Sequence, residues 1–190
     1  GMILRSNQIK TRYYALDKNG KSTHTNAELT AAAIRKLFDD SFGLEDIELL
    51  TAGTSSPDTI QPAHALMVQG ELGGKDIEVM SAHGTCNAAM LSLKYAVMAL
   101  MSGMANNAVV AGSETFSSWM HARNYDKEID RRKEIEQNPY IAFEKDFLRW
   151  MLSDGASALL LQDAPSSKGL SLKIDWMEIR SFANELEACM

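Results

Sequence analysis

The sequence predicts an α/β fold with a mixed, mostly parallel sheet, covering helices and an antiparallel closing strand. Between residues 26 and 115, three short apolar runs alternate with helical patterns. Strands that are separated by helices of this length form parallel β-α-β units with the helices packed on the sheet. Two further strand-like runs, at 153–164 and 170–182, have no helical pattern between them. They therefore predict an antiparallel pair that closes the sheet.

The individual elements follow from apolar spacing and from turn residues. Asn26 is the expected N-cap of the first helix, and Gly43 is its expected end. Pro62 is placed to start the second helix. The third helix is strongly apolar, which predicts burial on most of its circumference. In order, the predicted elements are a helix over 26–42, a strand over 47–52, a helix within 61–74, a strand within 75–84, a helix over 88–101 and a strand within 106–115.

The composition bounds the function. The 190 residues are 45% hydrophobic and 23% charged, which fits a single globular domain. With a net charge of −6 and no basic stripe, the chain is not expected to bind nucleic acid. No apolar run is long enough for a membrane span, and the first twenty residues do not resemble a signal peptide. Two distant cysteines, Cys86 and Cys189, predict reduced thiols in a cytoplasmic protein.

Cys86 lies between small residues where a strand meets a helix. It is either a small core filler or a nucleophile, because free cysteine is often buried and inert. The nucleophile needs a pocket, thiolate character and donors for an oxyanion, and the following helix N-terminus can supply the last two. Gly84 allows a sharp turn before Cys86, and Ala88 and Ala89 allow close packing after it.

Two further motifs lie at strand ends: Gly112-Ser113-Glu114 after one apolar run, and Asp154-Gly155 before another. With Cys86, their order and spacing resemble the β-ketoacyl-acyl-carrier-protein synthase III branch of the thiolase superfamily. "RSNQIKTRYY" is similar to an Arg-Thr-Gly-Ile-x-x-Arg stretch of that family, and "TIQPAHALMVQGELG" to its Pro-x-x-Ala-x-x-x-Gln-x-x-Leu-Gly helix. The resemblance covers roughly residues 5–164.

The resemblance implies that Cys86 accepts an acyl group from a thioester, after which a malonyl thioester condenses with loss of carbon dioxide. The family's catalytic His and Asn lie in the second half of a duplicated fold. Residues 1–190 are therefore expected to form one domain, the N-terminal half of a thiolase-like fold truncated at both ends and inactive alone. Acyl-CoA or acyl carrier protein is the implied partner, with no metal and no cofactor beyond the phosphopantetheine thioester. A homodimer is expected to pair edge to edge through the strand at 106–115.

Four residues besides Cys86 are candidates for substrate binding: Arg5, Gln61, Thr85 and Asn87. By resemblance, Arg5 contacts the phosphate of CoA or of the carrier protein. Gln61 stands where the family often has an apolar residue that closes the acyl tunnel across a dimer interface. Asn87 replaces a small residue that follows the cysteine. Together with Ser153, which replaces the first Gly of a Gly-Asp-Gly turn, these departures favour a specialised synthase of a secondary pathway over the housekeeping initiator.

The histidines and two other function classes remain open. His83 is either functional or a satisfied hydrogen-bonding residue, His121 could approach the pocket, and His24 and His64 are expected at the surface. One alternative is a non-catalytic ketosynthase-like subunit that shapes a partner's pocket. The other is an α/β-hydrolase with a cysteine nucleophile, since "GTCNA" is similar to a nucleophile elbow. That enzyme would need a histidine late in the chain.

Overall fold

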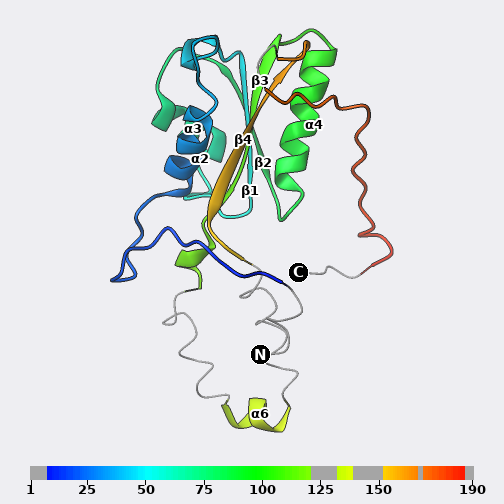
Figure 1. Ribbon diagram of the computed structural model, residues 1–190. Coiled ribbons are helices and arrows are strands. Elements are labelled where there is room, and N and C mark those ends of the chain that lie inside the picture. The colour runs from blue at the N-terminus through cyan, green and yellow to red at the C-terminus, as the bar shows by residue number, and fades with distance from the viewer. Residues whose placement is uncertain (1–7, 121–131, 139–151, 167–168, 187–190) are drawn as a thin grey trace.

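The computed structural model describes residues 8–120, 132–138, 152–166 and 169–186. A four-stranded sheet in the order β2-β1-β3-β4 forms its centre (Figure 1). β1 runs parallel to β2 and β3, whereas β4 is antiparallel to β3. The predicted mixed sheet with an antiparallel closing strand is confirmed. The strands are β1 (Leu49–Thr54), β2 (Glu78–His83), β3 (Asn107–Glu114) and β4 (Gly155–Gln162).

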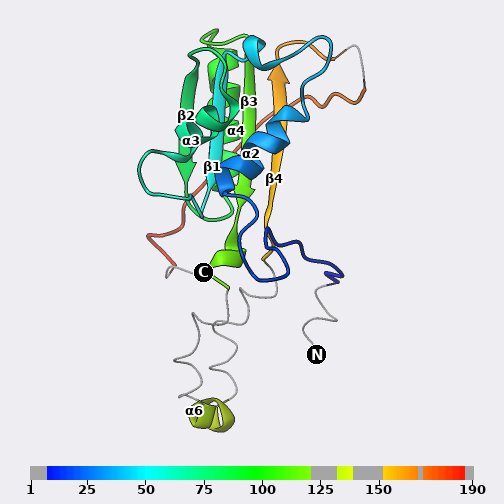
Figure 2. The same cartoon turned by 90° about the vertical axis from the view of Figure 1, so that its left-hand side faces the viewer.

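Helices lie on both faces of the sheet. In Figures 1 and 2, α2 and α3 cover one face and α4 covers the other. The connections through α3 and α4 join parallel strands, as the alternating pattern predicts. The helices are α2 (Asn26–Arg35), α3 (His64–Leu72), α4 (Ala88–Met101) and the short elements η1 (Leu44–Asp46), η2 (Phe116–Ser118) and α6 (Arg132–Gln137).

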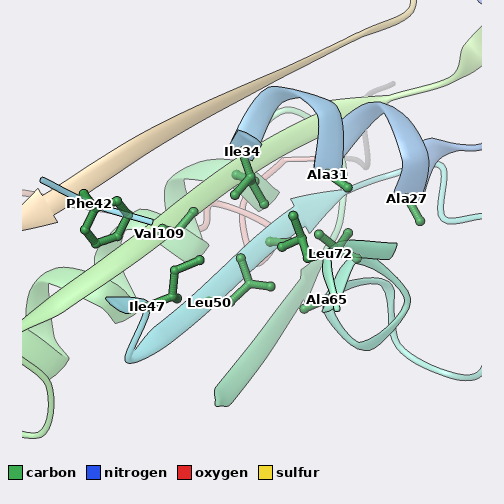
Figure 3. Close-up of a cluster of buried hydrophobic side chains, with 12 residues drawn as sticks. Ala27, Ala31, Ile34, Phe42, Ile47, Leu50, Ala65, Leu72 and Val109 are labelled. Carbon is green, nitrogen blue, oxygen red and sulfur yellow. The ribbon is translucent and has the colours of Figure 1, made fainter. Parts of the chain in front are cut away.

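Each face of the sheet has its own core, because side chains alternate along a strand. Leu50 of β1 and Val109 of β3 are buried against α2 and α3, where Figure 3 shows them beside Ile34. Leu49 and Val110, their neighbours in sequence, belong to the second cluster beneath α4. The buried α4 residues of this second cluster are alanines, Ala96 and Ala99, and the partly buried Leu93, Tyr95 and Leu100 of α4 pack against it.

α2 begins at Asn26, but its N-cap is the preceding residue and not Asn26 itself. Thr25 is the N-cap: its hydroxyl accepts from the Glu28 N–H at 3.1 Å, and the Glu28 carboxylate accepts from the Thr25 N–H at 2.7 Å. This capping box satisfies two backbone donors at once. The Asn26 side chain is therefore free for a buried role within the fold.

α2 also ends earlier than predicted, at Arg35 rather than at Phe42. The Asp39 carboxylate accepts from the backbone N–H groups of Ser41 and Phe42. A short polar side chain that bonds its neighbouring backbone in this way stabilises a turn in place of a helix. Gly43 thus follows a turn and does not end the helix.

α4 has the predicted bounds, but the expectation that most of its circumference is buried is wrong. A stripe of small residues faces the sheet: Ala88, Ser92, Ala96 and Ala99. On its outer side, Met98 is 53% exposed and Met101 is 84% exposed. The described residues therefore cover only one side of an apolar helix.

The strand expected over 170–182 is absent: the described residues 169–186 contain no strand. Leu170 and Trp176 are 87% and 80% exposed. Their alternating pattern suits a half-buried strand, but a strand also needs a neighbour to hydrogen-bond, and the described residues offer none.

The structure also corrects the predicted dimer contact. β3 is hydrogen-bonded to β1 on one side and to β4 on the other, so the strand at 106–115 has no free edge for a second subunit. Within the described sheet, β2 and β4 are the edge strands.

Among the helices that the structure describes, none is long and apolar enough to cross a bilayer.

Candidate functional site

Cys86 lies at the edge of the sheet where the three parallel strands end. It follows β2 and precedes α4, and its side chain is exposed. The described residues place no apolar packing around the sulfur, so the interpretation of Cys86 as a core filler is wrong. The loops that follow β1 and β3 lie at the same edge, which is where α/β folds place functional groups.

Two glycines seat the first turn of α4 on the strands. A Cβ at Gly53 of β1 would lie 2.4 Å from the carbonyl carbon of Ala88, and one at Gly112 of β3 would lie 2.8 Å from the Ala89 Cβ. Gly53 and Gly112 are direct partners in the ladder between β1 and β3. Because neither has a side chain, the helix that follows Cys86 lies directly on the two central strands.

The residues next to Cys86 form a tight turn into the helix. Gly84 has φ +148, which L side chains rarely adopt. The Ala88 N–H donates to the Thr85 carbonyl at 3.0 Å. Asn87 is the N-cap, yet its side chain makes no capping hydrogen bond. Among the described residues, no side chain accepts from the first turn, and its N–H groups and positive dipole end favour a negative charge beside Cys86.

The other candidate residues are not part of this turn in the sequence. Gln61 is exposed in the loop between β1 and α3, and its peptide bond to Pro62 is cis. His83, the last residue of β2, is exposed, and no hydrogen bond is recorded for its ring within the described chain. Arg5, His121 and Cys189 lie outside the described residues.

Glu114 holds the loop that follows β1. Its carboxylate accepts from the Ser55 N–H and hydroxyl, both at 2.8 Å, and from the Ser56 hydroxyl at 2.5 Å. The Ser56 hydroxyl oxygen in turn accepts from the Thr115 N–H at 2.9 Å. The sequence motif at 112–114 thus supplies a carboxylate that fixes the ends of β1 and β3 to each other.

A buried polar cluster continues from this loop to the face that α2 and α3 cover. His64 is 3% exposed, so the expectation that it lies at the surface is wrong; His24, by contrast, is exposed as predicted. His64 Nε2 lies 3.1 Å from Ser113 Oγ and 3.3 Å from Thr30 Oγ1. Burial lowers the pKa of His64, while the charges of Asp58 and Glu114 partly oppose this shift. The imidazole is therefore neutral near pH 7.

Asp154 anchors the start of β4 and the N-terminal segment. Its buried carboxylate accepts from the Ala15 N–H at 2.7 Å and from the Ser117 N–H at 2.9 Å. The Ser153 hydroxyl contacts the Tyr13 N–H and carbonyl at 2.8 and 2.9 Å. The serine that departs from the Gly-Asp-Gly pattern thus has a structural role.

Sequence reasoning missed the cluster of Asn26, Thr30 and His64. Asn26 and Thr30 are four residues apart on α2, so two polar residues share the helix face that also buries Ala27 and Ile34. That interruption of an apolar face was the available signal. The partners, by contrast, lie 28 to 83 positions away and cannot be inferred from spacing.

Comparisons with known proteins agree with the geometry. No family model matches the chain. β-Ketoacyl-[acyl-carrier-protein] synthase III of Clostridium perfringens strain 13 is 32% identical over 109 residues, which is 57% of this chain and 32% of that protein. The Neisseria gonorrhoeae (strain NCCP11945) synthase III is 37% identical over 110 residues, 57% of this chain and 33% of that protein. The matches thus span about a third of these curated relatives.

Solved structures extend the similarity. A Xanthomonas campestris OleA variant, bound with cerulenin, aligns with TM-score 0.57 and 28% identity over 72% of this chain and 39% of its own. AbyA1, a tetronic acid condensing enzyme, aligns with TM-score 0.61 and 22% identity over 83% of this chain and 41% of its own, which shows the fold alone. The chain is thus similar to β-ketoacyl-acyl-carrier-protein synthase III, and its described residues have a thiolase-like fold.

Proposed function

We propose that this chain is part of a condensing acyltransferase in which Cys86 carries the acyl group. The observation that carries the proposal is the position of Cys86: it is exposed, and it directly precedes a helix whose first turn is seated on β1 and β3 and has no side-chain cap. The similarity to synthase III adds the reaction class.

Acyl transfer begins when the Cys86 thiolate attacks the carbonyl carbon of an acyl thioester. A new C–S bond forms, and the negative charge moves to the carbonyl oxygen, to which backbone N–H groups of the α4 first turn can donate hydrogen bonds. The tetrahedral intermediate then collapses, the original C–S bond breaks, and the thiol of CoA or of phosphopantetheine leaves. Thr85 and Asn87 flank this centre, and we assign them to the walls of the acyl site.

The second step is the condensation of the acyl group with a malonyl thioester and loss of carbon dioxide. The resemblance assigns this step to a His and an Asn in the other half of a duplicated fold. We therefore treat residues 1–190 as one half of the catalytic unit, which accepts an acyl group without completing the condensation. The exposed outer side of α4 and the unpaired segment at 170–182 agree with a missing neighbour.

The partners follow from this chemistry. Acyl-CoA or acyl carrier protein delivers the primer, and Arg5 remains the proposed contact for its phosphate. A homodimer, if it forms through the sheet, uses the free edge of β2 rather than β3. In that arrangement Gln61 of one subunit, exposed in the loop after β1, is the proposed polar wall of the partner's acyl site.

Mass spectrometry after incubation with a panel of acyl-CoA primers tests the proposal. We expect a mass increase equal to one acyl group, mapped to the peptide that contains Cys86 and lost in Cys86→Ser. Cys189→Ser is the matched control, because it removes the only other cysteine and is expected to retain the adduct. The proposal fails if no primer acylates Cys86.

The alternatives give different results. A non-catalytic ketosynthase-like subunit is supported if no adduct forms and the chain instead binds a second, complete synthase. The α/β-hydrolase alternative is disfavoured, because the sheet is thiolase-like.

A further inference from the structure

We propose that His64 is a positioning residue for Cys86: through Ser113 and Thr30 it fixes the strand ends on which the nucleophile helix rests. The proposal concerns the buried cluster on the face of the sheet opposite α4, which the acyl-transfer steps do not use. It rests on the proposed function of Cys86 and deepens it.

The cluster is a chain of hydrogen bonds with one consistent direction. Thr30 Oγ1 lies 2.7 Å from the Asn26 carbonyl, which can only accept, so the Thr30 hydroxyl donates its single hydrogen there. The 2.7 Å contact between Thr30 Oγ1 and Ser113 Oγ is then donated by Ser113. Ser113 Oγ in turn accepts from His64 Nε2 at 3.1 Å. This series of hydrogen bonds therefore requires that the hydrogen of the neutral His64 ring is on Nε2.

The second ring nitrogen agrees with that assignment. His64 Nδ1 is buried, and it has no hydrogen-bond partner among the residues that the structure describes. In the Nε2–H form, Nδ1 carries a lone pair instead of a hydrogen. A protonated imidazole would place an unpaired N–H and a positive charge in the core, which is strongly unfavourable. His64 thus acts as a neutral donor.

Two dipeptides connect the cluster to the glycines that lie beneath the first turn of α4. Gly53 is followed by Thr54, and Gly112 is followed by Ser113. Because side chains alternate along a strand, each glycine faces α4, whereas the polar side chain after it faces the opposite side of the sheet. Thr54 Oγ1 accepts from Asn26 Nδ2 at 2.9 Å, and Ser113 is bonded to Thr30 and His64. Because Gly53 and Gly112 are paired in the ladder between β1 and β3, the cluster restrains the positions of both glycines together.

The experiment uses the full chain with Cys189→Ser, which leaves Cys86 as the only thiol. His64→Ala removes the donor, whereas His64→Gln retains a side-chain N–H of similar reach. Two readouts are compared: the amide NMR signals of Gly53, Gly112 and Ala89, and the second-order rate constant for alkylation of Cys86 by iodoacetamide. We expect His64→Ala to shift the signals and to slow alkylation about two- to fivefold, the range of a helix-terminus contribution. His64→Gln is expected to restore both.

Ile34→Val and Ile34→Ala are the controls for a general loss of stability, because Ile34 is fully buried in the same face but outside the cluster. At a matched free energy of unfolding, they are expected to leave both readouts at wild-type values. Should His64→Ala fail to fold, Ser113→Ala removes the same hydrogen bond through one oxygen atom and is held to the same expectation.

The positioning role is overturned if the glycine signals and the rate stay at wild-type values, or if the Ile34 variants reproduce the change. Failure of the proposed function has a different signature. In that case no acyl adduct forms on Cys86, while the glycine signals still respond to His64.

Discussion

Gly53 lies so close to Ala88 that a methyl group on Gly53 would be 2.4 Å from the Ala88 carbonyl carbon and oxygen. Backbone atoms cannot yield to such a contact, so α4 would have to move. We expect Gly53→Ala to lower the free energy of unfolding by about 2 kcal/mol or more, as overpacking does in other cores. Urea denaturation monitored by circular dichroism measures this change.

The matched control is Gly70→Ala in α3. Apart from the backbone of α3 and the two chain neighbours, no atom of the described residues lies within 4 Å of the added Cβ, and the position is inside a helix. Alanine there is expected to raise the free energy of unfolding by about 0.5 to 1 kcal/mol. Equal stability of Gly53→Ala and the wild type would show that α4 is not seated on β1.

The contact between Gly112 and Ala89 permits a sharper test, because it joins two side-chain positions. A Cβ at Gly112 would lie 2.8 Å from the Ala89 Cβ, and the next nearest atom is 4.0 Å away. Gly112→Ala alone is expected to destabilise by about 1 to 3 kcal/mol. In the Ala89→Gly background, the same change should be nearly neutral. A double-mutant cycle measured by urea denaturation gives the coupling energy, and strictly additive effects would contradict the contact.

Glu114 is expected to stabilise the loop at 54–56 through acceptor oxygens. Glu114→Gln replaces one of the two acceptor oxygens with an NH2 group, which cannot accept the hydrogen bonds that Ser55 or Ser56 donates there. We expect a loss of about 1 to 3 kcal/mol and faster hydrogen exchange at the Ser55 amide. Glu71→Gln on the exposed side of α3 is the control and is expected to change stability by less than about 0.5 kcal/mol. Unchanged exchange at Ser55 would disprove this role.

Local patterns were sufficient for part of the fold. The bounds of α4 follow from a continuous apolar run, and the order of strands and helices predicts the parallel units. The alternation at 170–182 did not yield a strand, since a pattern specifies a face but supplies no partner. Likewise, the dimer expectation for 106–115 failed because the neighbours of β3 depend on the whole sheet.

The candidate site divides in the same way. Cys86 could be predicted because its chemistry depends on a local corner of strand and helix. The buried cluster beneath this turn could not be predicted, because His64 and Ser113 are 49 residues apart and meet only after β1 and β3 have paired. As a polar residue type, His64 was expected at the surface. It is buried instead, because hydrogen bonds such as the one to Ser113 satisfy Nε2 of its ring in the core.

The buried imidazole predicts a characteristic acid sensitivity. Burial lowers the pKa of His64 from 6.5, against the opposing charges of Asp58 and Glu114. Between the lowered value and about 6.5, the unfolded chain binds a proton at His64 that the folded chain does not bind. The folded state therefore loses stability as pH falls through this window, by at most about 1.4 kcal/mol per pH unit from this group. Above the window, His64 adds no pH dependence.

Urea unfolding of the wild type and of His64→Gln between about pH 5 and 8 checks this sign. The difference in unfolding free energy between the two proteins is expected to be constant at the alkaline end and to shrink or reverse as pH falls, because the glutamine cannot titrate. If the wild-type and His64→Gln curves are parallel throughout, His64 does not differ in proton binding between the folded and unfolded chains, and the neutral donor at the base of the Cys86 seat is disproved.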